Sequence, residues 1–398
     1  MNVPKLRFKE FNDKWKPINL ANTFQYFSTN SFSREQLSES GILKNLHYGD
    51  IHRKYNSIVN ENKDITSYIK DINYVNKYEL LKNNDLIFAD ASEDYEGIGK
   101  AVEVVNVNNN TVSGLHTILA RDNSNVFAPM FKGYYFNSPI VHNQVRVLAN
   151  GFKVYGISRD SINKLNIRIP SIKEQSKIAN TLYLLDKKIE LQTKKIEDLK
   201  LFKKGLNKFV FSSCTDEYKI ENLIIEYSNK TTENNQYEVL SSTANGITFQ
   251  NEYFNKQAAS NNNTGYKIIP KGFITYRSMS DNGEFHFNIQ DITDIGIVSP
   301  AYPVFNIKKN LVNKIYFVYY INENDSFKNE ILSTKEGGTR YALSITKFKT
   351  LNILLPKIEE QIKYSKYINI IINKIQLEEK KLEKLIQLKK GLMQNMFV

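Results

Sequence analysis

The chain is poor in cysteine, and its single residue of this type, Cys214, cannot form an intramolecular disulfide. Long hydrophobic runs are also missing: the richest stretch, residues 315–321, is much shorter than the roughly 18 apolar residues that span a bilayer. The first residues lack the apolar core of a secretory signal peptide. We therefore expect a soluble protein of the reducing cytoplasm, with no membrane segment.

The motifs of DNA-modifying enzymes are missing as well. None of the nine prolines belongs to an Asn-Pro-Pro-aromatic sequence, and the nearest approach to a P-loop, residues 97–100, lacks its first glycine and its Ser/Thr. The five histidines form no pair at i, i+4, and a single cysteine supplies no zinc set. Asp50 with Glu61 and Lys63 fits only the loosest pattern of a nuclease. We expect neither a catalytic nor a metal site in this chain.

Positive charge, in contrast, is in excess. The chain has 54 Lys+Arg against 42 Asp+Glu, a formal net charge of +12. This excess favours a polyanionic partner, nucleic acid before an acidic membrane surface, although a generally basic surface is the simpler alternative. A length of 398 residues favours two domains.

One segment of the chain occurs twice. Residues 165–211 and 351–397 align without a gap at an offset of 186, with 20 of 47 positions identical. The shared residues include the pairs Pro170/Pro356, Glu174/Glu360 and Gln175/Gln361, and the block Lys-Lys-Gly-Leu at 203–206 and 389–392. The offset persists more faintly upstream, where Tyr155 falls on Tyr341. Near the N-terminus Trp15-Lys16 resembles Tyr218-Lys219, with a small shift from this offset. The chain is therefore a tandem duplication.

The similar segments have the pattern of long helices. Each begins just after a proline, and each carries a glutamate in its first turn, where a carboxylate favours the helix dipole. Apolar residues recur at the 3–4 spacing of a packing seam. These positions are 182, 185, 189, 196, 199, 206 and 210, and again 368, 371, 375, 382, 385, 392 and 396. Polar residues interrupt both seams at equivalent places, Gln192/Glu378 and Lys203/Lys389. Two unrelated amphipathic helices are the alternative to a paired seam.

The divergent segments alternate short strand patterns with turn-forming clusters such as residues 106–110, 261–263 and 281–283. The candidate strands are 85–89, 101–105 and 145–148 in the first segment, and 272–276, 295–298 and 315–321 in the second. The predicted class is α+β: two mixed α/β domains and two long helices that form an antiparallel coiled coil, arranged as a pseudo-twofold tandem duplication. We place the domains at 1–160 and 213–346, and the helical segments at 161–212 and 347–398.

This layout resembles the specificity subunits of type I restriction-modification systems. The sequences NIRIPSIKEQSKIA and NILLPKIEEQIKYS resemble the family's signature at the entry to each helix, and LKLFKKGLNKFVF and LIQLKKGLMQNMFV resemble its helix ends. GIVSPAYPVF (296–305), NGFKVYGIS (150–158) and EGGTRYALS (336–344) resemble its target-recognition domains. The first copy departs from this pattern, because Gly114-Leu115-His116 stands where the second has Pro300-Ala301-Tyr302.

The resemblance implies a DNA-binding subunit without catalysis of its own. Each target-recognition domain would read one half of a bipartite, asymmetric target in double-stranded DNA. The helices would set the spacing and dock two methyltransferase subunits, in a complex that also contains restriction/translocase subunits. S-adenosylmethionine, ATP and Mg²⁺ would belong to those partners. Two other functions stay open: a DNA-modifying enzyme with an unrecognised site, and a coiled-coil adaptor that reads no DNA.

Basic and aromatic residues near the expected turns are the candidates for DNA contact. Arg and Lys pair naturally with guanine, although phosphate contacts are the commoner kind, and a tyrosine can equally be buried. The candidates are Arg53, Lys54, Arg121, Lys153 and Tyr155 in the first domain, and Lys267, Lys271, Arg277, Arg340 and Tyr341 in the second.

Overall fold

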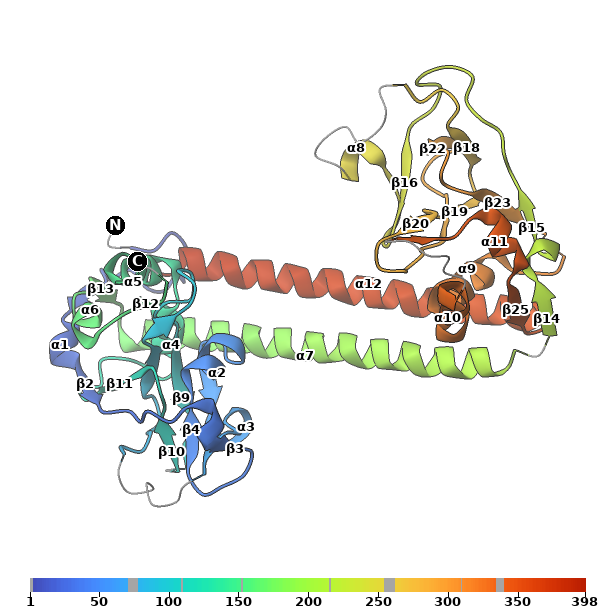
Figure 1. Cartoon of the computed structure of the whole chain (residues 1–398). Coiled ribbons are helices and arrows are strands. Elements are labelled where there is room, and N and C mark those ends of the chain that lie inside the picture. Colours follow the sequence, from blue (N-terminus) through green and yellow to red (C-terminus); the bar gives the residue numbers. More distant parts are fainter. Residues whose placement is uncertain are drawn as a thin grey trace. The chain divides into compact units, whose positions relative to one another are not determined.

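The structure, a computed structural model, describes residues 3–70, 78–108, 110–151, 153–214, 216–253, 262–308, 310–333 and 340–398. Its contacts divide the chain into two compact units. Unit 1 comprises Met1–Lys194 and Glu379–Val398, and unit 2 comprises Lys195–Glu378. Each unit therefore contains one divergent segment and parts of both long helices (Figure 1).

The two predicted long helices are present. Helix α7 (Ile172–Ser212) has 41 residues and α12 (Ile358–Asn395) has 38. Every predicted seam position is buried or half-buried. The glutamates at the two helix starts differ: Glu174 is buried and accepts two hydrogen bonds from Arg7, at 2.7 and 2.8 Å, whereas Glu360 is exposed.

Within each unit the two helices run antiparallel. In unit 2, Lys195 lies 3.0 Å from Glu378, and the ring of Phe209, further along α7, contacts Tyr364, which is earlier in α12. In unit 1, Asp186 lies 2.5 Å from Lys389. The polar seam positions are thus matched by partners: Glu378 and Lys389 have these ion pairs, and Lys203 pairs with Glu323 at 2.8 Å.

A buried glutamine joins each long helix to its own domain. The Gln175 side chain accepts a hydrogen bond from Ala128 N (2.9 Å) and donates to Pro170 O and Val126 O. Gln361 likewise accepts from Asn313 N (2.9 Å) and donates to Pro356 O (2.8 Å). The repeated Pro-x-x-x-Glu-Gln sequence is therefore a structural joint, because these amides satisfy backbone groups that burial would otherwise leave unpaired.

The duplication extends to the sheets. Unit 1 has a five-stranded sheet in the order β2-β11-β7-β9-β5, and unit 2 a four-stranded sheet in the order β15-β23-β19-β21. The first four strands of the unit 1 sheet match the unit 2 sheet one by one, all paired antiparallel. Their bounds are β2 (Phe24–Phe27), β11 (Thr117–Asp122), β7 (Leu86–Ala89), β9 (Ala101–Val105), β5 (Ile58–Asn60), β15 (Ile224–Glu226), β23 (Val304–Ile307), β19 (Ile274–Thr275) and β21 (Asn288–Ile289).

Two short antiparallel pairs also recur. In the first pair, Ile18 lies opposite Ile167, and Tyr218 lies opposite the equivalent residue Ile353. Tyr218 therefore corresponds to Ile18. The predicted match of Trp15-Lys16 to Tyr218-Lys219 was wrong by three residues. In the second, Tyr155 lies opposite Ser92 and Tyr341 opposite Ser280. These strands are β1 (Lys16–Ile18), β13 (Ile167–Ile169), β14 (Asp216–Lys219), β25 (Asn352–Leu355), β8 (Ala91–Ser92), β12 (Tyr155–Gly156), β20 (Met279–Ser280) and β24 (Tyr341–Ala342).

The remaining elements differ more between the units. Unit 1 has a sheet in the order β10-β4-β6-β3, and unit 2 has the pairs β16-β17 and β18-β22. The strands are β3 (Leu37–Ser38), β4 (Lys44–Leu46), β6 (Tyr68–Ile69), β10 (Thr111–Ser113), β16 (Leu240–Thr243), β17 (Gly246–Phe249), β18 (Lys267–Pro270) and β22 (Ile295–Val298). The shorter helices are α1 (Leu20–Thr23), η1 (Arg34–Gln36), α2 (Tyr48–Arg53), α3 (Glu61–Asp64), α4 (Phe131–Phe136), α5 (Pro139–Leu148), α6 (Arg159–Asn163), η3 (Ile220–Asn222), α8 (Gln250–Tyr253), α9 (Lys314–Glu323), α10 (Asp325–Ser333) and α11 (Ile345–Thr350).

Four of the six predicted strands are found, at least in part, and two predictions are wrong. Residues 145–148 lie in α5, which begins with Pro139 at a position where proline favours a helix. Residues 315–321 lie in α9, where the side chain of Asn313 caps the helix by accepting from Tyr316 N. This helix is buried on several faces, so its apolar run is continuous and looks like a buried strand. The turn residues 336–339, with Phe152, Asn109 and Asn261 of other predicted turns, lie outside the described residues.

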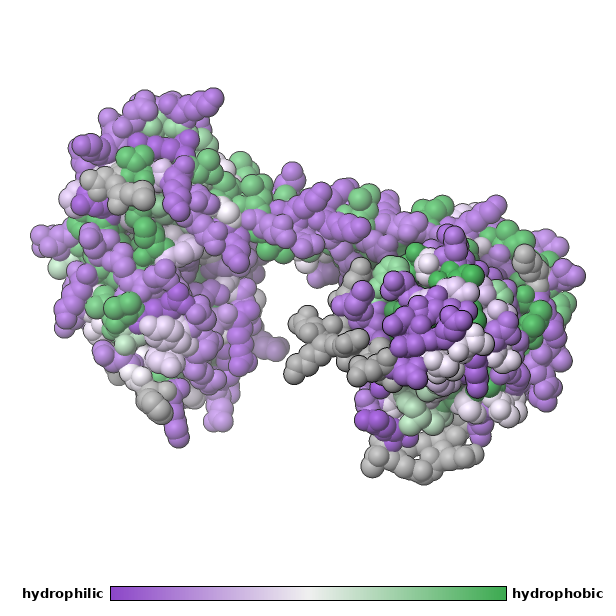
Figure 2. All heavy atoms as spheres, turned by 90° about the horizontal axis from the view of Figure 1, so that it is seen from above, coloured by the Kyte–Doolittle hydropathy of each residue, from purple (hydrophilic) through white to green (hydrophobic). Residues whose placement is uncertain are grey.

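The surface carries mostly hydrophilic side chains. In the view of Figure 2 they cover most of the visible face of each unit, and hydrophobic residues form smaller patches. Among the helices that the structure describes, none has the length and hydrophobicity needed to cross a membrane.

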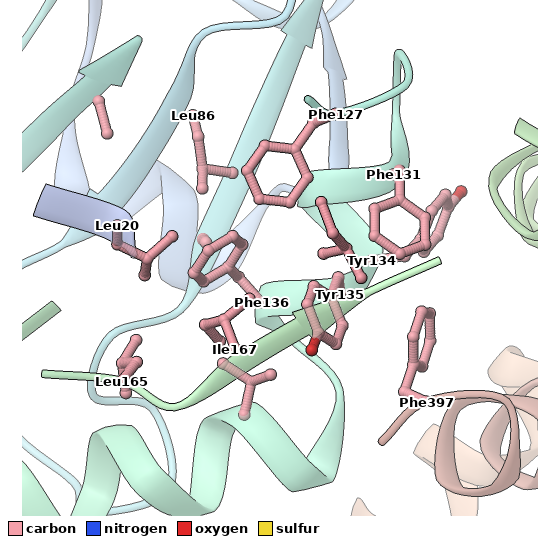
Figure 3. Packing of buried hydrophobic residues seen from close by; sticks show 14 of the residues in the cluster. Leu20, Leu86, Phe127, Phe131, Tyr134, Tyr135, Phe136, Leu165, Ile167 and Phe397 are labelled. Atoms are coloured by element: carbon pink, nitrogen blue, oxygen red, sulfur yellow. The ribbon is translucent and has the colours of Figure 1, made fainter. Parts of the chain in front are cut away.

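The largest hydrophobic core of unit 1 includes the end of α12. Phe397 is 4% exposed, and its ring centroid lies 5.4 Å from that of Tyr135 and 5.9 Å from that of Phe131 (Figure 3). Trp15, the single tryptophan, is buried in the same cluster and contacts Tyr135 edge-on. The first domain is therefore completed by residues from the far end of the sequence.

Phe397→Ala should lower the free energy of unfolding of unit 1 by about 3 to 5 kcal/mol, because it removes a buried ring and leaves a cavity. Ile386→Ala, at an exposed position of α12 in the same unit, should change it by less than about 0.5 kcal/mol. Urea titration followed by Trp15 fluorescence measures both variants. Equal effects would show that Phe397 is not part of this core.

Candidate nucleic-acid interface

The candidates in unit 1 lie at different places on the domain. Arg53, the last residue of α2, is exposed, and Lys54 beside it lies 3.2 Å from the Asp50 carboxylate. Lys153 is exposed in the turn that precedes β12. Tyr155 is half-buried and contacts the ring of Tyr95 edge-on, at 5.2 Å. Except for Tyr155, these side chains offer positive charge to the solvent.

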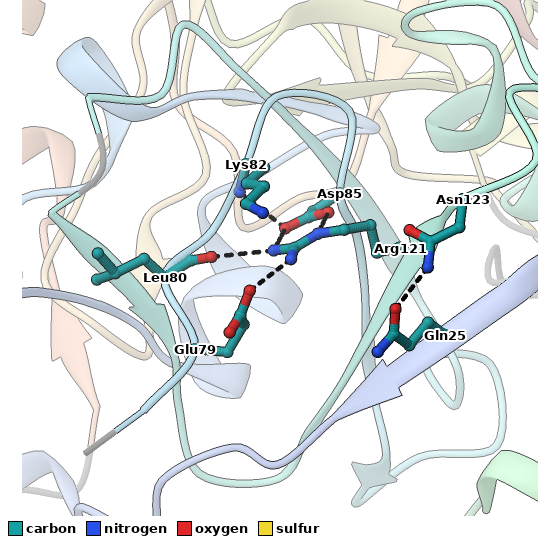
Figure 4. Close-up of polar contacts among 7 residues, drawn as sticks. All are labelled: Gln25, Glu79, Leu80, Lys82, Asp85, Arg121 and Asn123. Carbon is teal, nitrogen blue, oxygen red and sulfur yellow. Dashed lines mark hydrogen bonds and ion pairs between the residues drawn. The ribbon is translucent and has the colours of Figure 1, made fainter. Parts of the chain in front are cut away.

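Arg121, in contrast, is engaged inside the domain. Its guanidinium donates to both oxygens of Asp85 at 2.8 Å, to Glu79 at 2.5 Å and to Leu80 O at 3.0 Å (Figure 4). The hydrogen bond to Asp85 raises the pKa of Arg121. Asp85 is 1% exposed, and the guanidinium also lies over the ring of Phe27. These contacts give Arg121 a structural role.

The candidates in unit 2 fall into two groups. Lys267 is half-buried in β18 and donates to Tyr302 O (2.9 Å), and burial lowers the pKa of its amine. Lys271 is exposed and lies 3.7 Å from Asp294. The structure brings the other three together around the β20-β24 pair. Arg277 lines a groove there, Arg340 binds Asp281 of the groove wall, and Tyr341 pairs with Ser280.

A ring cluster in unit 1 was not predicted. The ring of Tyr48 lies 4.7 Å from His47, 6.1 Å from His52 and 5.2 Å from His116. His47 accepts from Gly49 N at the start of α2, and burial lowers its pKa. His116 is exposed, has φ +53°, and lies 3.3 Å from Asp90. The departure at Gly114-Leu115-His116 was the one sequence signal for this cluster, but it could not indicate which rings His116 contacts.

The comparison with known families gives two matches. The family described as the type I restriction modification DNA specificity domain matches residues 12–201 and again 217–387. The chain belongs to this family. Both matches run from a divergent segment into a long helix, as the duplicated fold does.

Individual relatives of this specificity-domain chain are distant. It is 29% identical over 165 residues to the putative type I restriction enzyme MjaX specificity subunit of Methanocaldococcus jannaschii, which is 39% of this chain and only 37% of that relative's length. Its fold is similar to the crystal structure of a type I restriction-modification system S subunit from M. genitalium (TM-score 0.61, 15% identity, 100% and 99% of the two chains). It is also similar to a structure concerned with complex assembly and conformational transition of the type I R-M system (TM-score 0.52, 13% identity, 95% and 96%).

The residues of the loose nuclease pattern have separate structural partners in this specificity-domain fold. Asp50 binds Arg34 and Lys54, Glu61 accepts from Thr111 Oγ1, and Lys63 pairs with Glu190 of α7. Over the described part of the chain, no three His, Cys, Asp or Glu side chains lie close enough together to hold a metal ion.

Arg121→Ala should lower the free energy of unfolding by about 3 to 5 kcal/mol, because it leaves the buried Asp85 carboxylate without its partner. The matched control Arg53→Ala removes an exposed guanidinium from the same unit and should change stability by less than about 0.5 kcal/mol. Trp15 fluorescence during urea unfolding compares the two. A stable Arg121→Ala protein that binds DNA more weakly would contradict the structural role.

Proposed function

We propose that this chain is the DNA-reading specificity subunit of a type I restriction-modification complex. Residues 1–160 and 213–346 are its two target-recognition domains, and each reads one half of a bipartite, asymmetric target. The helical segments 161–212 and 347–398 set the distance between the half-sites. The observation that carries the proposal is the double family match on a duplicated fold, in which each match runs from a divergent segment into a long helix.

In this proposal the chain is the non-catalytic member of a cytoplasmic complex. Its partners are double-stranded DNA, two methyltransferase subunits that dock on the helices, and restriction/translocase subunits. S-adenosylmethionine, ATP and Mg²⁺ act in those partners. The absence of methyltransferase and nucleotide-binding motifs from the sequence supports this division of tasks.

The exposed candidates are proposed as DNA contacts: Arg53, Lys54, Lys153, Lys271, Arg277, Arg340 and, with half-buried rings, Tyr155 and Tyr341. A net charge of +12 supports attraction to the phosphate backbone, which dominates affinity and weakens with salt. Arg121 and Lys267 are left out, because their charged groups are bound inside the domains.

Exchange of residues 213–346 for the matching region of another family member should change one half-site and leave the other intact. The reason is that unit 2 has its own sheets and its own hydrophobic core. Methylation-sensitive sequencing of cells that carry the chimera with its methyltransferase measures the target. A simultaneous change of both half-sites would contradict independent reading, and a wild-type complex without any sequence preference would favour the adaptor alternative.

Matched insertions in both long helices should lengthen the spacer. Four residues between Lys194 and Lys195, with four between Glu378 and Glu379, add about 6 Å of helix and turn each helix by about 40° beyond a full turn. We expect the same half-sites with a spacer longer by one or two base pairs, since base pairs are about 3.4 Å apart.

The control for this experiment inserts two residues at each of the same places, which turns the apolar seam by about 200° and should abolish activity. Selection from duplexes with variable spacers measures the preference. An active four-residue variant with an unchanged spacer would show that the helices do not set the distance.

A further inference from the structure

The groove of unit 2 that Arg277 lines has the chemistry of a base-reading site. It lies beside the β20-β24 pair, and Met279, Asp281, Asn282 and Tyr302 also line it. Arg277 and Met279 are both exposed to solvent here. A cation and an apolar side chain are therefore accessible together, and both kinds of side chain contact base edges in a major groove.

Among the described residues of this groove, Arg277 is a cation that remains available for a ligand. Arg340 binds Asp281 at 2.9 Å, and His286 lies 4.0 Å from Glu284. For the Arg277 side chain, no ion pair or hydrogen bond is found among the described residues. An exposed, unpaired guanidinium can therefore make the two parallel hydrogen bonds that a guanine edge accepts, without first breaking an internal bond.

The loop that forms the groove wall is held in one shape. Asn282 accepts from Ser280 Oγ (2.8 Å) and from Glu284 N (3.1 Å), and Gly283 N donates to Ser280 Oγ (3.0 Å). Gly283 has φ +85°, and a Cβ atom there would lie 2.6 Å from Leu332, so this turn requires glycine. A wall that is already ordered loses little conformational freedom when DNA binds.

The equivalent place in unit 1 shares a short strand pair and a backbone hydrogen bond with this groove but has different side chains. Leu343 N donates to Ser278 O beside the groove, and Ile157 N, at the equivalent position, donates to Asp90 O, both at 2.9 Å. His116 stands 186 residues before Tyr302, and it lies against Tyr48 and Asp90. Equivalent places in the two units thus carry different side chains, which recognition of two different half-sites would require.

We propose that Arg277 reads the guanine of a G·C base pair in the half-site bound by unit 2, through paired hydrogen bonds from its guanidinium in the groove beside β20-β24. The inference rests on the proposed function and adds to it the residue and the base. It also gives Arg277 and Lys271 different roles. Lys271 is an exposed cation of the same unit but lies outside the groove, so it would contact the phosphate backbone and not a base.

The test compares Arg277→Lys, Arg277→Ala and the control Lys271→Ala, each in the complex with its methyltransferase subunits, by selection from duplexes randomised in both half-sites. Both Arg277 variants should lose roughly 5- to 140-fold of the preference for G·C at one position, since a bidentate contact contributes about 1 to 3 kcal/mol. The affected position should lie in the half-site that exchange of residues 213–346 changes. Lys271→Ala should keep every preference and weaken all sequences alike.

Three results would overturn the assignment. Retained G·C preference in Arg277→Lys would mean that a single ammonium group suffices, so that paired hydrogen bonds from the guanidinium do not read the base. Unchanged specificity in Arg277→Ala would show that another residue reads this base pair. A loss of preference in the other half-site would show that Arg277 does not contact the half-site bound by unit 2. A wild-type complex that selects no sequence would refute the proposed function itself, and this result is distinguishable because it precedes any substitution.

Discussion

The buried glutamine at the start of each long helix is the contact on which the two-unit design depends. Gln175 and Gln361 each hold the first turn of a helix to the backbone of the domain in front of it. The amide supplies a donor and an acceptor at one point, which fixes direction as well as distance. A domain that could turn on its helix would lose a defined orientation toward DNA. The glutamine occurs in both copies, although the glutamate beside it is buried and paired in one copy and exposed in the other.

The lysines that interrupt the helix seams show how one fold carries two different domains. Lys203 lies over the ring of Tyr319 and Lys389 over that of Tyr134, at 5.5 and 5.9 Å. Their carboxylate partners differ, because Lys203 binds Glu323 of α9 whereas Lys389 binds Asp186 of α7. The two copies thus share the contact between the lysine and a tyrosine ring, whereas the carboxylate that pairs with the lysine differs. The loops around His116 and Tyr302 differ further, because Gly114-Leu115-His116 in one copy stands where the other has Pro300-Ala301-Tyr302.

The helices, the duplication and the family were predictable because they depend on local patterns: a seam at 3–4 spacing and a repeated entry sequence. The candidate site was predicted only in part, since its residues meet through contacts distant in sequence. Arg121 could not be told from an exposed arginine, because Asp85 and Glu79 are 36 and 42 residues away. The run at 315–321 was assigned to a strand because a helix buried on several faces has no apolar stripe. The groove around Arg277 was missed because β20 and β24 are two-residue strands.

The participation of Phe397 and Leu392 in the core of unit 1 has a consequence for biosynthesis. The ribosome makes the first domain early, but the residues that complete its core follow only after all of unit 2 has been translated. At about 5–20 residues per second, the nascent first domain waits roughly 10 to 40 seconds with part of its apolar surface uncovered. During that interval it is a candidate for chaperone binding, and the order of synthesis makes unit 2 the first unit that can fold to completion.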